Sequence, residues 1–507
     1  MMRMISKRFF LTAGFSALAT MACARAPERS LRPQGRPAHG SAGAATAPST
    51  AGPTQPKVAS AQALIARAEL GGKVGFAVAD AKTGLVLESG NGRTGLPPAS
   101  VTKAVTALYA LATLGAGHRF YTELRLSGTI SNGVLQGDLI LKGGGDPTLD
   151  TDRMAELARA LKAAGLREVK GKFIVDGTAL PSLDEIDRDQ PEHVGYNPAI
   201  SGIALNFNRV HFEWKRAGGK WSTTMDARSD RYRPNVRFAK MKIASRDAPV
   251  YTYASKGQED HWSVSAQALG KGGSRWLPVR QPELYAGEVL RELARAQGVS
   301  LPQPQKGAGQ SGQRVLLRQQ SADLRSICRD FLKYSNNMMT EMVGLAATAA
   351  RSGRPVSLKA SAGEMSRWAA ATLGMGGSRF VDHSGLGEDS RATAEDMAKA
   401  LVAARSEIAP ILKPIALRDA KGRVKKDHPI DVHAKTGTLN FVSALAGYAK
   451  GADGTVMSFA IIAADTDRRA RIKRSERESP QGARSWNKRA KGLQQDLIER
   501  WGTLYAS

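Results

Sequence analysis

The 507-residue sequence contains only two cysteines, Cys23 and Cys328, so no disulfide framework can hold the fold together. Beyond the N-terminal segment, it has no uninterrupted apolar run of about 18 residues, which argues against a transmembrane helix in the mature chain. It also lacks an H-E-x-x-H zinc motif and a G-x-S-x-G elbow. Gly143-Gly144-Gly145 lacks the Gly-Lys-Ser/Thr ending of a phosphate-binding loop and is interpreted as a turn.

Acidic residues are scarce relative to basic ones, with 46 Asp+Glu against 73 Lys+Arg and a net charge of +27. Such a surface favours anionic partners: nucleic acid, anionic lipid headgroups or an acidic cell-wall polymer. The sequence has no zinc finger, no RNP motif and no basic stripe interleaved with aromatic residues, so nucleic acid is disfavoured. Peripheral membrane or wall association stays open, beside the simpler interpretation of a soluble basic protein.

The N-terminus predicts export to the periplasm. Basic residues precede the apolar run Phe9–Ala24, and Ala22-Cys23-Ala24 is an A-x-A cleavage pattern, so residues 1–24 are predicted to be a signal peptide. Lipid attachment at Cys23 is possible but less favoured, because the preceding residues make a poor lipobox. Ser6–Leu11 also resembles a Lys-Arg version of a twin-arginine signal, which leaves the export route open.

Composition and periodicity divide the rest of the chain. Residues 25–60 are rich in Ala, Pro and Gly and are predicted to be a flexible linker. Residues 61–120 and 317–507 combine amphipathic helical patterns with strand patterns at both ends, which predicts an α/β sandwich with an antiparallel sheet. The expected strands are a hairpin, Gly75–Ala79 and Leu85–Ser89, and three consecutive strands, Val432–Thr438, Ser443–Ala449 and Thr455–Ala464; a last helix is expected over Ala490–Tyr505. Residues 121–316 show short strand patterns between turns, with one helical run at Arg153–Ala164, and are predicted to be a large β-rich insertion of one or two units.

The first candidate for chemistry is Ser100-Val101-Thr102-Lys103, which follows Pro97-Pro98-Ala99 at the expected start of a helix. Residues three apart share a helix face, so the Lys103 amine can reach the Ser100 hydroxyl. A lysine with a lowered pKa can take the serine proton, and a helix N-terminus supplies N–H groups for an oxyanion. Taken alone the motif is weak, because S-x-x-K recurs at Ser485-Trp486-Asn487-Lys488.

Two further motifs follow in the sequence. Ser335-Asn336-Asn337 lies between two helical patterns; it is either an ordinary helix-joining turn or a loop that relays a proton and holds an amide. Lys435-Thr436-Gly437-Thr438 begins an apolar strand, where the two threonines share one face and could bind a carboxylate. The K-T-G tripeptide is also weak alone, because it recurs at Lys82-Thr83-Gly84 in a predicted hairpin turn. Gly437 would let a ligand backbone approach. Alternation places Lys435 on the opposite face, so it has to reach the site from beneath the strand.

The three motifs occur in the order S-x-x-K, S-x-N, K-T-G, and together they resemble the penicilloyl-serine transferases. Roughly 230 residues separate Lys103 from Ser335. This long insertion is typical of the class C low-molecular-mass penicillin-binding proteins, the D-alanyl-D-alanine carboxypeptidases and endopeptidases of peptidase family S13. Further stretches are similar to that family: Gly144–Leu149, Tyr196-Asn197-Pro198, Asp382–Leu386 and His433–Tyr448.

One segment departs from the family pattern. The usual D-G-S-G-L-S-R reads Asp382-His383-Ser384-Gly385-Leu386-Gly387-Glu388, so histidine replaces a glycine and glutamate replaces an arginine. In relatives this segment lies near the substrate side chain. A basic residue turned acidic is expected to alter recognition of an acidic side chain such as diaminopimelate.

The resemblance implies a mechanism without metal or cofactor. Lys103 takes the proton while Ser100 attacks the carbonyl between two D-alanines, and Ser335, bridging Lys103 and Lys435, passes the proton to the leaving D-alanine. Lys435 also keeps Lys103 neutral by charge repulsion. Backbone N–H groups of Ser100 and Thr438 form the oxyanion hole. The substrate-binding residues implied are Asn337, Lys435, Thr436, Gly437 and Thr438.

Peptidoglycan peptides are then the substrates, and β-lactams are inhibitors that acylate Ser100. Two rivals remain: a β-lactamase or esterase on the same scaffold, and a non-catalytic wall-binding protein. The acidic cluster Asp184–His193 is interpreted as a solvated loop in preference to a metal site. The balance of carboxypeptidase and endopeptidase activity, the oligomeric state and the partners of the insertion are not determined by the sequence.

Overall fold

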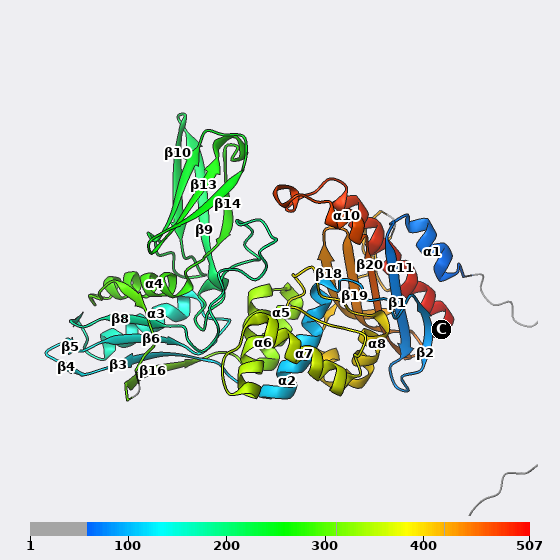
Figure 1. Ribbon diagram of the computed structural model, residues 1–507, viewed down its shortest axis with the longest axis horizontal. Helices are drawn as coiled ribbons and strands as arrows, with labels where there is room; N and C mark the ends of the chain where they lie inside the picture. Colours follow the sequence, from blue (N-terminus) through cyan, green and yellow to red (C-terminus); the bar gives the residue numbers. More distant parts are fainter. Residues whose placement is uncertain (1–57, 311, 420, 507) are drawn as a thin grey trace, which may run out of the picture. The chain divides into compact units, whose positions relative to one another are not determined.

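The computed structural model describes residues 58–310, 312–419 and 421–506 (Figure 1). The predicted signal peptide lies outside these residues, and so does the predicted linker apart from its last three positions. The described chain begins with α1 (Ala61–Ala68), which Ser60 caps by accepting a hydrogen bond from the Ala63 amide. No helix in the described part of the chain is long and apolar enough to span a bilayer.

A six-stranded antiparallel sheet forms the centre of the α/β region, in the order β17-β18-β19-β20-β1-β2. The hairpin predicted near the N-terminus and the three strands predicted near the C-terminus are all present. The strands are β1 (Lys73–Asp80), β2 (Val86–Gly90), β17 (Lys413–Pro414), β18 (Asp431–Leu439), β19 (Val442–Lys450) and β20 (Val456–Ala464).

Alternation along β20 shows how the sheet is covered on both faces. Phe459 and Ile461 pack into the core beneath α1 and α11 (Ala483–Tyr505), whereas Ala460 and Ile462 belong to the core on the opposite face. The helices on that opposite face are α2 (Thr102–Leu114), α5 (Leu324–Tyr334), α6 (Asn337–Ser352), α7 (Leu358–Leu373) and α8 (Ala394–Ala403). The predicted α/β sandwich is therefore confirmed. Helix α11 begins seven residues before the predicted start at position 490.

The chain between α2 and α5 forms four further sheets. A five-stranded sheet has the order β15-β8-β6-β3-β16, from β3 (Tyr121–Leu126), β6 (Leu139–Gly143), β8 (Phe173–Asp176), β15 (Pro304–Lys306) and β16 (Arg314–Gln320). A three-stranded sheet joins β9 (Arg209–Ala217), β10 (Lys220–Asp226) and β14 (Gly272–Pro278); another joins β11 (Ala239–Ala244), β12 (Tyr251–Lys256) and β13 (Glu259–Ser265). The smallest joins β4 (Thr129–Ser131), β5 (Val134–Gln136) and β7 (Glu168–Val169).

The described residues of this β-rich segment include two α-helices, of which only the first was expected from the sequence. Helix α3 (Thr151–Ala163) matches the predicted run, with Asp150 as its N-cap. Helix α4 (Pro282–Ala296) was missed, although Pro282 at its first turn and its amphipathic spacing are ordinary helix signals. The domain boundary predicted between residues 316 and 317 falls inside β16, which pairs with β3.

Candidate active site

Ser100 lies in a short 3-10 turn (Ala99–Val101) that continues directly into α2. The preceding Ala99 has φ +47°, a left-handed conformation that is uncommon for residues with a side chain and that clusters at functional sites. Gly437 of β18 packs against this turn: a Cβ there would lie 2.9 Å from the Pro98 carbonyl and 3.1 Å from the Ser100 amide. Glycine therefore lets β18 approach the backbone around Ser100.

Lys103 is fully buried, and its amine has three partners. Nζ lies 3.1 Å from Ser100 Oγ, 2.7 Å from Asn337 Oδ1 and 2.7 Å from the Ser384 carbonyl oxygen. A neutral amine has two N–H donors and one lone pair. The Asn337 and Ser384 oxygens can only accept, so a neutral Lys103 directs its lone pair at the Ser100 hydroxyl. This is the geometry required of a general base.

Burial lowers the pKa of Lys103 to about 8, because the charged form loses its hydration. The carboxyl groups of Glu341 and Asp382 oppose this effect. Burial raises the pKa of both acids, so the protein environment disfavours charge on all three groups. The resemblance implied that repulsion by Lys435 favours the neutral form of Lys103; burial is instead the main cause of its lowered pKa.

The Ser335-Asn336-Asn337 triplet is a helix junction and also faces the site. Ser335 ends α5 in a left-handed conformation, φ +57°, while the Asn336 side chain caps α6 by accepting from the Met339 amide. Asn337, the first residue of α6, accepts from Lys103 and donates from Nδ2 to the Tyr196 carbonyl oxygen at 3.0 Å. The two interpretations of this motif are therefore compatible: the turn geometry places Ser335 and Asn337 beside the two lysines.

Lys435 is fully buried and donates from Nζ to Ser335 Oγ at 3.0 Å and to the Thr436 carbonyl oxygen at 2.6 Å. Burial and then the nearby Lys103 hold the pKa of Lys435 well below its usual value. Among the described hydrogen bonds, Ser335 contacts Lys435 only, and the amine of Lys103 is bound by Asn337 instead of Ser335. Of the two contacts expected of Ser335, to Lys103 and to Lys435, the structure thus shows the one to Lys435.

The side chains of β18 alternate as expected, and this resolves how Lys435 reaches the site. Lys435 shares a face with Gly437, which packs against the Ser100 turn, so this face is the one directed at the nucleophile. Thr436 and Thr438 lie on the opposite face, with Ala434, which packs into the core beneath α11. Strand β17 pairs only with positions 433 and 434, so β17 does not cover the β18 edge beyond them. Thr438 lines the cavity in front of Ser100, whereas Thr436 is half-buried and does not line it.

This cavity has a volume of about 310 Å³ and brings together Ser100, Ser335, Asn337 and Thr438. Its wall also holds residues that the sequence analysis did not select as site residues: Gln190, Tyr196, Glu388, Asn440, Arg469, Arg477, Glu478 and Asn487. No short motif marks Arg469 or Arg477, which stand in a basic stretch that looks like a solvated surface. Only the fold brings them to the nucleophile.

The second S-x-x-K and K-T-G matches have structural roles. Ser485 donates to the Gly482 carbonyl oxygen at the start of α11, and the neighbouring Trp486 is buried. Thr83 lies in the turn between β1 and β2 and donates to Asp80. The acidic 184–193 loop is held by Arg280, which donates to the Asp184 and Glu192 carbonyl oxygens. Within the described residues, no group of three or more His, Cys, Asp or Glu is placed to hold a metal ion.

His383 lies behind the site and is fully buried. Its Nε2 lies 2.7 Å from Ser361 Oγ, and its ring stacks on Tyr109. Burial lowers the pKa of His383 to about 3, so the ring is neutral at physiological pH. Gly344 of α6 makes room for this ring, because a Cβ at that position would overlap the imidazole.

We expect Gly344→Ala to destabilise the fold by about 1–3 kcal/mol through this overlap, although alanine normally favours a helix. Removing the ring should relieve the overlap, so Gly344→Ala/His383→Gly should recover stability relative to Gly344→Ala. Gly363→Ala in α7 is the matched control: its Cβ would meet only the flexible end of Arg367, at 3.8 Å. Urea unfolding measures all three. Equal effects of the two alanines would refute the packing argument.

Comparisons with known proteins match most of the described chain. Residues 58–479 match the family model described as D-Ala-D-Ala carboxypeptidase 3 (S13). The D-alanyl-D-alanine carboxypeptidase of Actinomadura sp. is 28% identical over 428 residues, covering 76% of this chain and 77% of the relative. D-alanyl-D-alanine carboxypeptidase DacB of Haemophilus influenzae is 24% identical over 417 residues, covering 77% and 85% respectively. The crystal structure of penicillin binding protein 4 (dacB) from Haemophilus influenzae matches with a TM-score of 0.70 at 19% identity, covering 87% of this chain and 100% of that one.

Proposed function

Since the chain belongs to the D-Ala-D-Ala carboxypeptidase 3 (S13) family, we infer that it is a serine peptidase that acts on peptidoglycan and binds β-lactams. The bond cleaved is an amide whose carbonyl belongs to D-alanine: the D-alanyl-D-alanine bond at the end of a stem peptide, the bond from D-alanine to the neighbouring stem in a cross-link, or both. The observation that carries this assignment is the position of Lys103 Nζ, 3.1 Å from Ser100 Oγ, with its other hydrogen bonds directed at acceptors.

Acylation follows from this geometry. As Ser100 Oγ bonds to the carbonyl carbon, its proton passes to Lys103 Nζ, and the negative charge moves to the carbonyl oxygen. The Ser100 and Thr438 amides are proposed to stabilise that oxygen. The C–N bond then breaks, and the leaving amine takes a proton through Ser335, which Lys435 holds by a hydrogen bond of 3.0 Å. Water hydrolyses the acyl-enzyme and regenerates Ser100.

The amide group of Asn337 is occupied at both ends before substrate binds, by Lys103 and by the Tyr196 carbonyl oxygen. Tyr196 belongs to the segment inserted between α2 and α5, so this segment helps to orient a side chain of the proposed active site. We propose that a substrate amide replaces the Tyr196 contact when it binds Asn337.

Export to the periplasm is also part of this proposal. It is supported by the predicted signal peptide and by the substrate, which lies outside the cytoplasm. Cleavage after Ala24 would give a mature N-terminus at Arg25, which N-terminal sequencing of the secreted protein can test; a blocked, lipid-modified Cys23 would support the alternative.

D-alanine release by the purified enzyme tests the function, together with intact-mass analysis after brief exposure to benzylpenicillin. A peptidase releases D-alanine from a peptide ending in D-alanyl-D-alanine, or separates the two stems of a cross-linked fragment, and it carries one persistent penicilloyl adduct. Penicillin consumed without an adduct would indicate a β-lactamase. Intact penicillin, no adduct and no peptide cleavage would leave the wall-binding alternative.

The substrate side chain is expected to contact the charged residues Glu388, Arg469 and Arg477, which line the cavity in front of Ser100. Glu388 is held in ion pairs by Arg469 at 2.9 Å and by Arg477 at 3.3 Å, so the acidic residue in the family segment is neutralised. Arg469 is buried, at 7% exposure, and its Nε has no hydrogen-bond partner in the described structure. A buried unsatisfied donor requires an explanation, and on the wall of a substrate cavity an acceptor group of the ligand is one that the position offers.

We therefore predict that Arg469→Gln lowers kcat/KM about fivefold to tenfold for a peptide with an acidic side chain beside the D-alanyl-D-alanine terminus. The same peptide with an amide in place of that carboxylate should be affected much less. Arg471→Gln, at an exposed position on the same segment, is the matched control. Equal losses on both peptides would show that Arg469 acts only as a structural partner of Glu388.

A further inference from the structure

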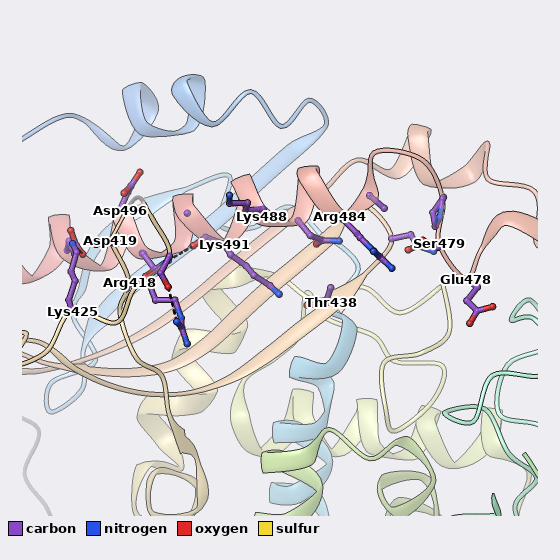
Figure 2. A pocket seen from close by; sticks show the side chains of 18 residues that line it. Arg418, Asp419, Lys425, Thr438, Glu478, Ser479, Arg484, Lys488, Lys491 and Asp496 are labelled. Carbon is purple, nitrogen blue, oxygen red and sulfur yellow. Dashed lines mark hydrogen bonds and ion pairs between the residues drawn. The ribbon is translucent and has the colours of Figure 1, made fainter. Parts of the chain in front are cut away.

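A second cavity, of about 840 Å³, adjoins the site and shares Thr438, Asn440, Glu478 and Asn487 with the cavity in front of Ser100 (Figure 2). Its walls are α11 and the segment between β17 and β18, which contributes Arg418, Asp419, Gly422 and Lys425. We call it the basic cavity. Its volume is comparable with that of ligand pockets in general, about 300–1,000 Å³.

Helix α11 presents three cations to the basic cavity: Arg484, Lys488 and Lys491. Their spacing of four and three residues places them on one face of the helix. The opposite face fixes this arrangement, because Trp486, Leu493 and other apolar residues of α11 are buried against the sheet.

The acidic residues of the basic cavity are already paired. Asp419 pairs with Arg423 at 2.8 Å, Asp496 with Arg67 at 2.9 Å, and Glu499 with Lys425. Glu478 is held by His193 and Arg275. By contrast, no acidic group in the described part of the chain lies within ion-pair distance of Arg484, Lys488 or Lys491.

Like charges at these spacings destabilise a helix by a few tenths of a kcal/mol per pair, so the three cations do not stabilise α11 itself. The three unpaired cations give the basic cavity an excess positive charge that is continuous with the catalytic cavity. We propose that the basic cavity binds carboxylates of the peptidoglycan strand that carries the scissile D-alanyl-D-alanine bond. This inference rests on the proposed function and adds a polymer-binding subsite to it.

The test compares wild type with Arg484→Gln/Lys488→Gln/Lys491→Gln. D-alanine release is measured from soluble, uncross-linked peptidoglycan strands and from a short acylated peptide whose only charge is its terminal carboxylate. We expect kcat/KM on the strands to fall roughly tenfold at ~20 mM salt, with the gap closing at ~500 mM as screening increases, and activity on the short peptide to stay within about twofold. Lys215→Gln/Lys220→Gln/Lys271→Gln removes the same charge from exposed positions around the β9–β10 hairpin and serves as the control.

The outcomes separate the two proposals. Loss confined to strands and to the cavity variant supports the basic cavity as a subsite. An equal loss in the control variant would show that only net charge matters, and unchanged strand activity would show that the cavity does not bind the polymer; either result overturns this inference. Failure of wild type to release D-alanine from both substrates, together with failure to separate the stems of a cross-linked fragment, would instead contradict the proposed function.

Discussion

Ser100→Ala is expected to abolish the penicilloyl adduct and to reduce D-alanine release at least about 10³-fold. The reason is chemical: alanine has no oxygen to form the acyl-enzyme, and no other hydroxyl lies within hydrogen-bond distance of Lys103 Nζ in the described residues. Intact-mass analysis after exposure to benzylpenicillin measures the adduct directly, independently of turnover.

The chain contains its own control for this experiment. Ser485 belongs to the second S-x-x-K match, but its hydroxyl donates to a backbone carbonyl at the start of α11, on the outside of the sheet. Ser485→Ala should therefore leave both adduct formation and D-alanine release unchanged. An adduct that persists in Ser100→Ala and disappears in Ser485→Ala would mean that the wrong motif was assigned.

Folding must be intact for the comparison to hold. Ser100 is partly exposed in the cavity, and its hydroxyl makes one described hydrogen bond, to Lys103. The substitution removes one oxygen and no packing contact in the core, so we expect a change in the free energy of unfolding of about 1 kcal/mol or less. Equal melting temperatures of wild type and Ser100→Ala would assign the loss of activity to chemistry.

The sequence predicted those parts of the fold and site that depend on local pattern. The β1–β2 hairpin and strands β18 to β20 follow from turns and alternation, and the positions of Ser100 and Lys103 follow from a helix start with three-residue spacing. The junction at Ser335 was also located correctly, since Ser and Asn are ordinary residues for ending one helix and beginning the next.

Other features depend on contacts between distant segments, which local pattern does not encode. The burial of Lys103 arises because Asn337 and Ser384 converge on it from separate elements. The ion pairs of Glu388 require Arg469 and Arg477, about 80–90 residues away in the sequence. The same applies to the Gly344–His383 pair: the histidine looks like a simple departure until the glycine that accommodates it is seen.

Lys103→Gln is the second substitution expected to have a very large effect, a loss of at least about 10³-fold in the rate of acylation by penicillin, equivalent to about 4 kcal/mol of activation free energy. Glutamine can still donate to the Asn337 and Ser384 oxygens, but its amide nitrogen has no basic lone pair. Ser100 is then left without a base, while the hydrogen bonds that hold the site can be retained.

The pH dependence distinguishes loss of a base from loss of structure. The pKa of Lys103 is lowered to about 8, and the active form is the neutral one, so wild-type acylation should rise as pH increases through about 8 and level off above it. The charged groups that act on this amine are Glu341 and Asp382, and Lys103 in turn interacts with Lys435 by charge repulsion. The rise of the rate with pH therefore reports the ionisation of this cluster.

Lys103→Gln should retain a small residual rate that does not rise through about pH 8, because the titrating amine is gone. Lys82→Gln, in the K-T-G match of the β1–β2 turn, is the control and should keep both the rate and its rise with pH, since Lys82 is exposed and does not line the cavity. If the acylation rate of Lys103→Gln were lower by the same factor at every pH and still rose through about pH 8, the base would be another group. Lys435 would then be the first alternative, because it too is buried with a lowered pKa and is held against Ser335.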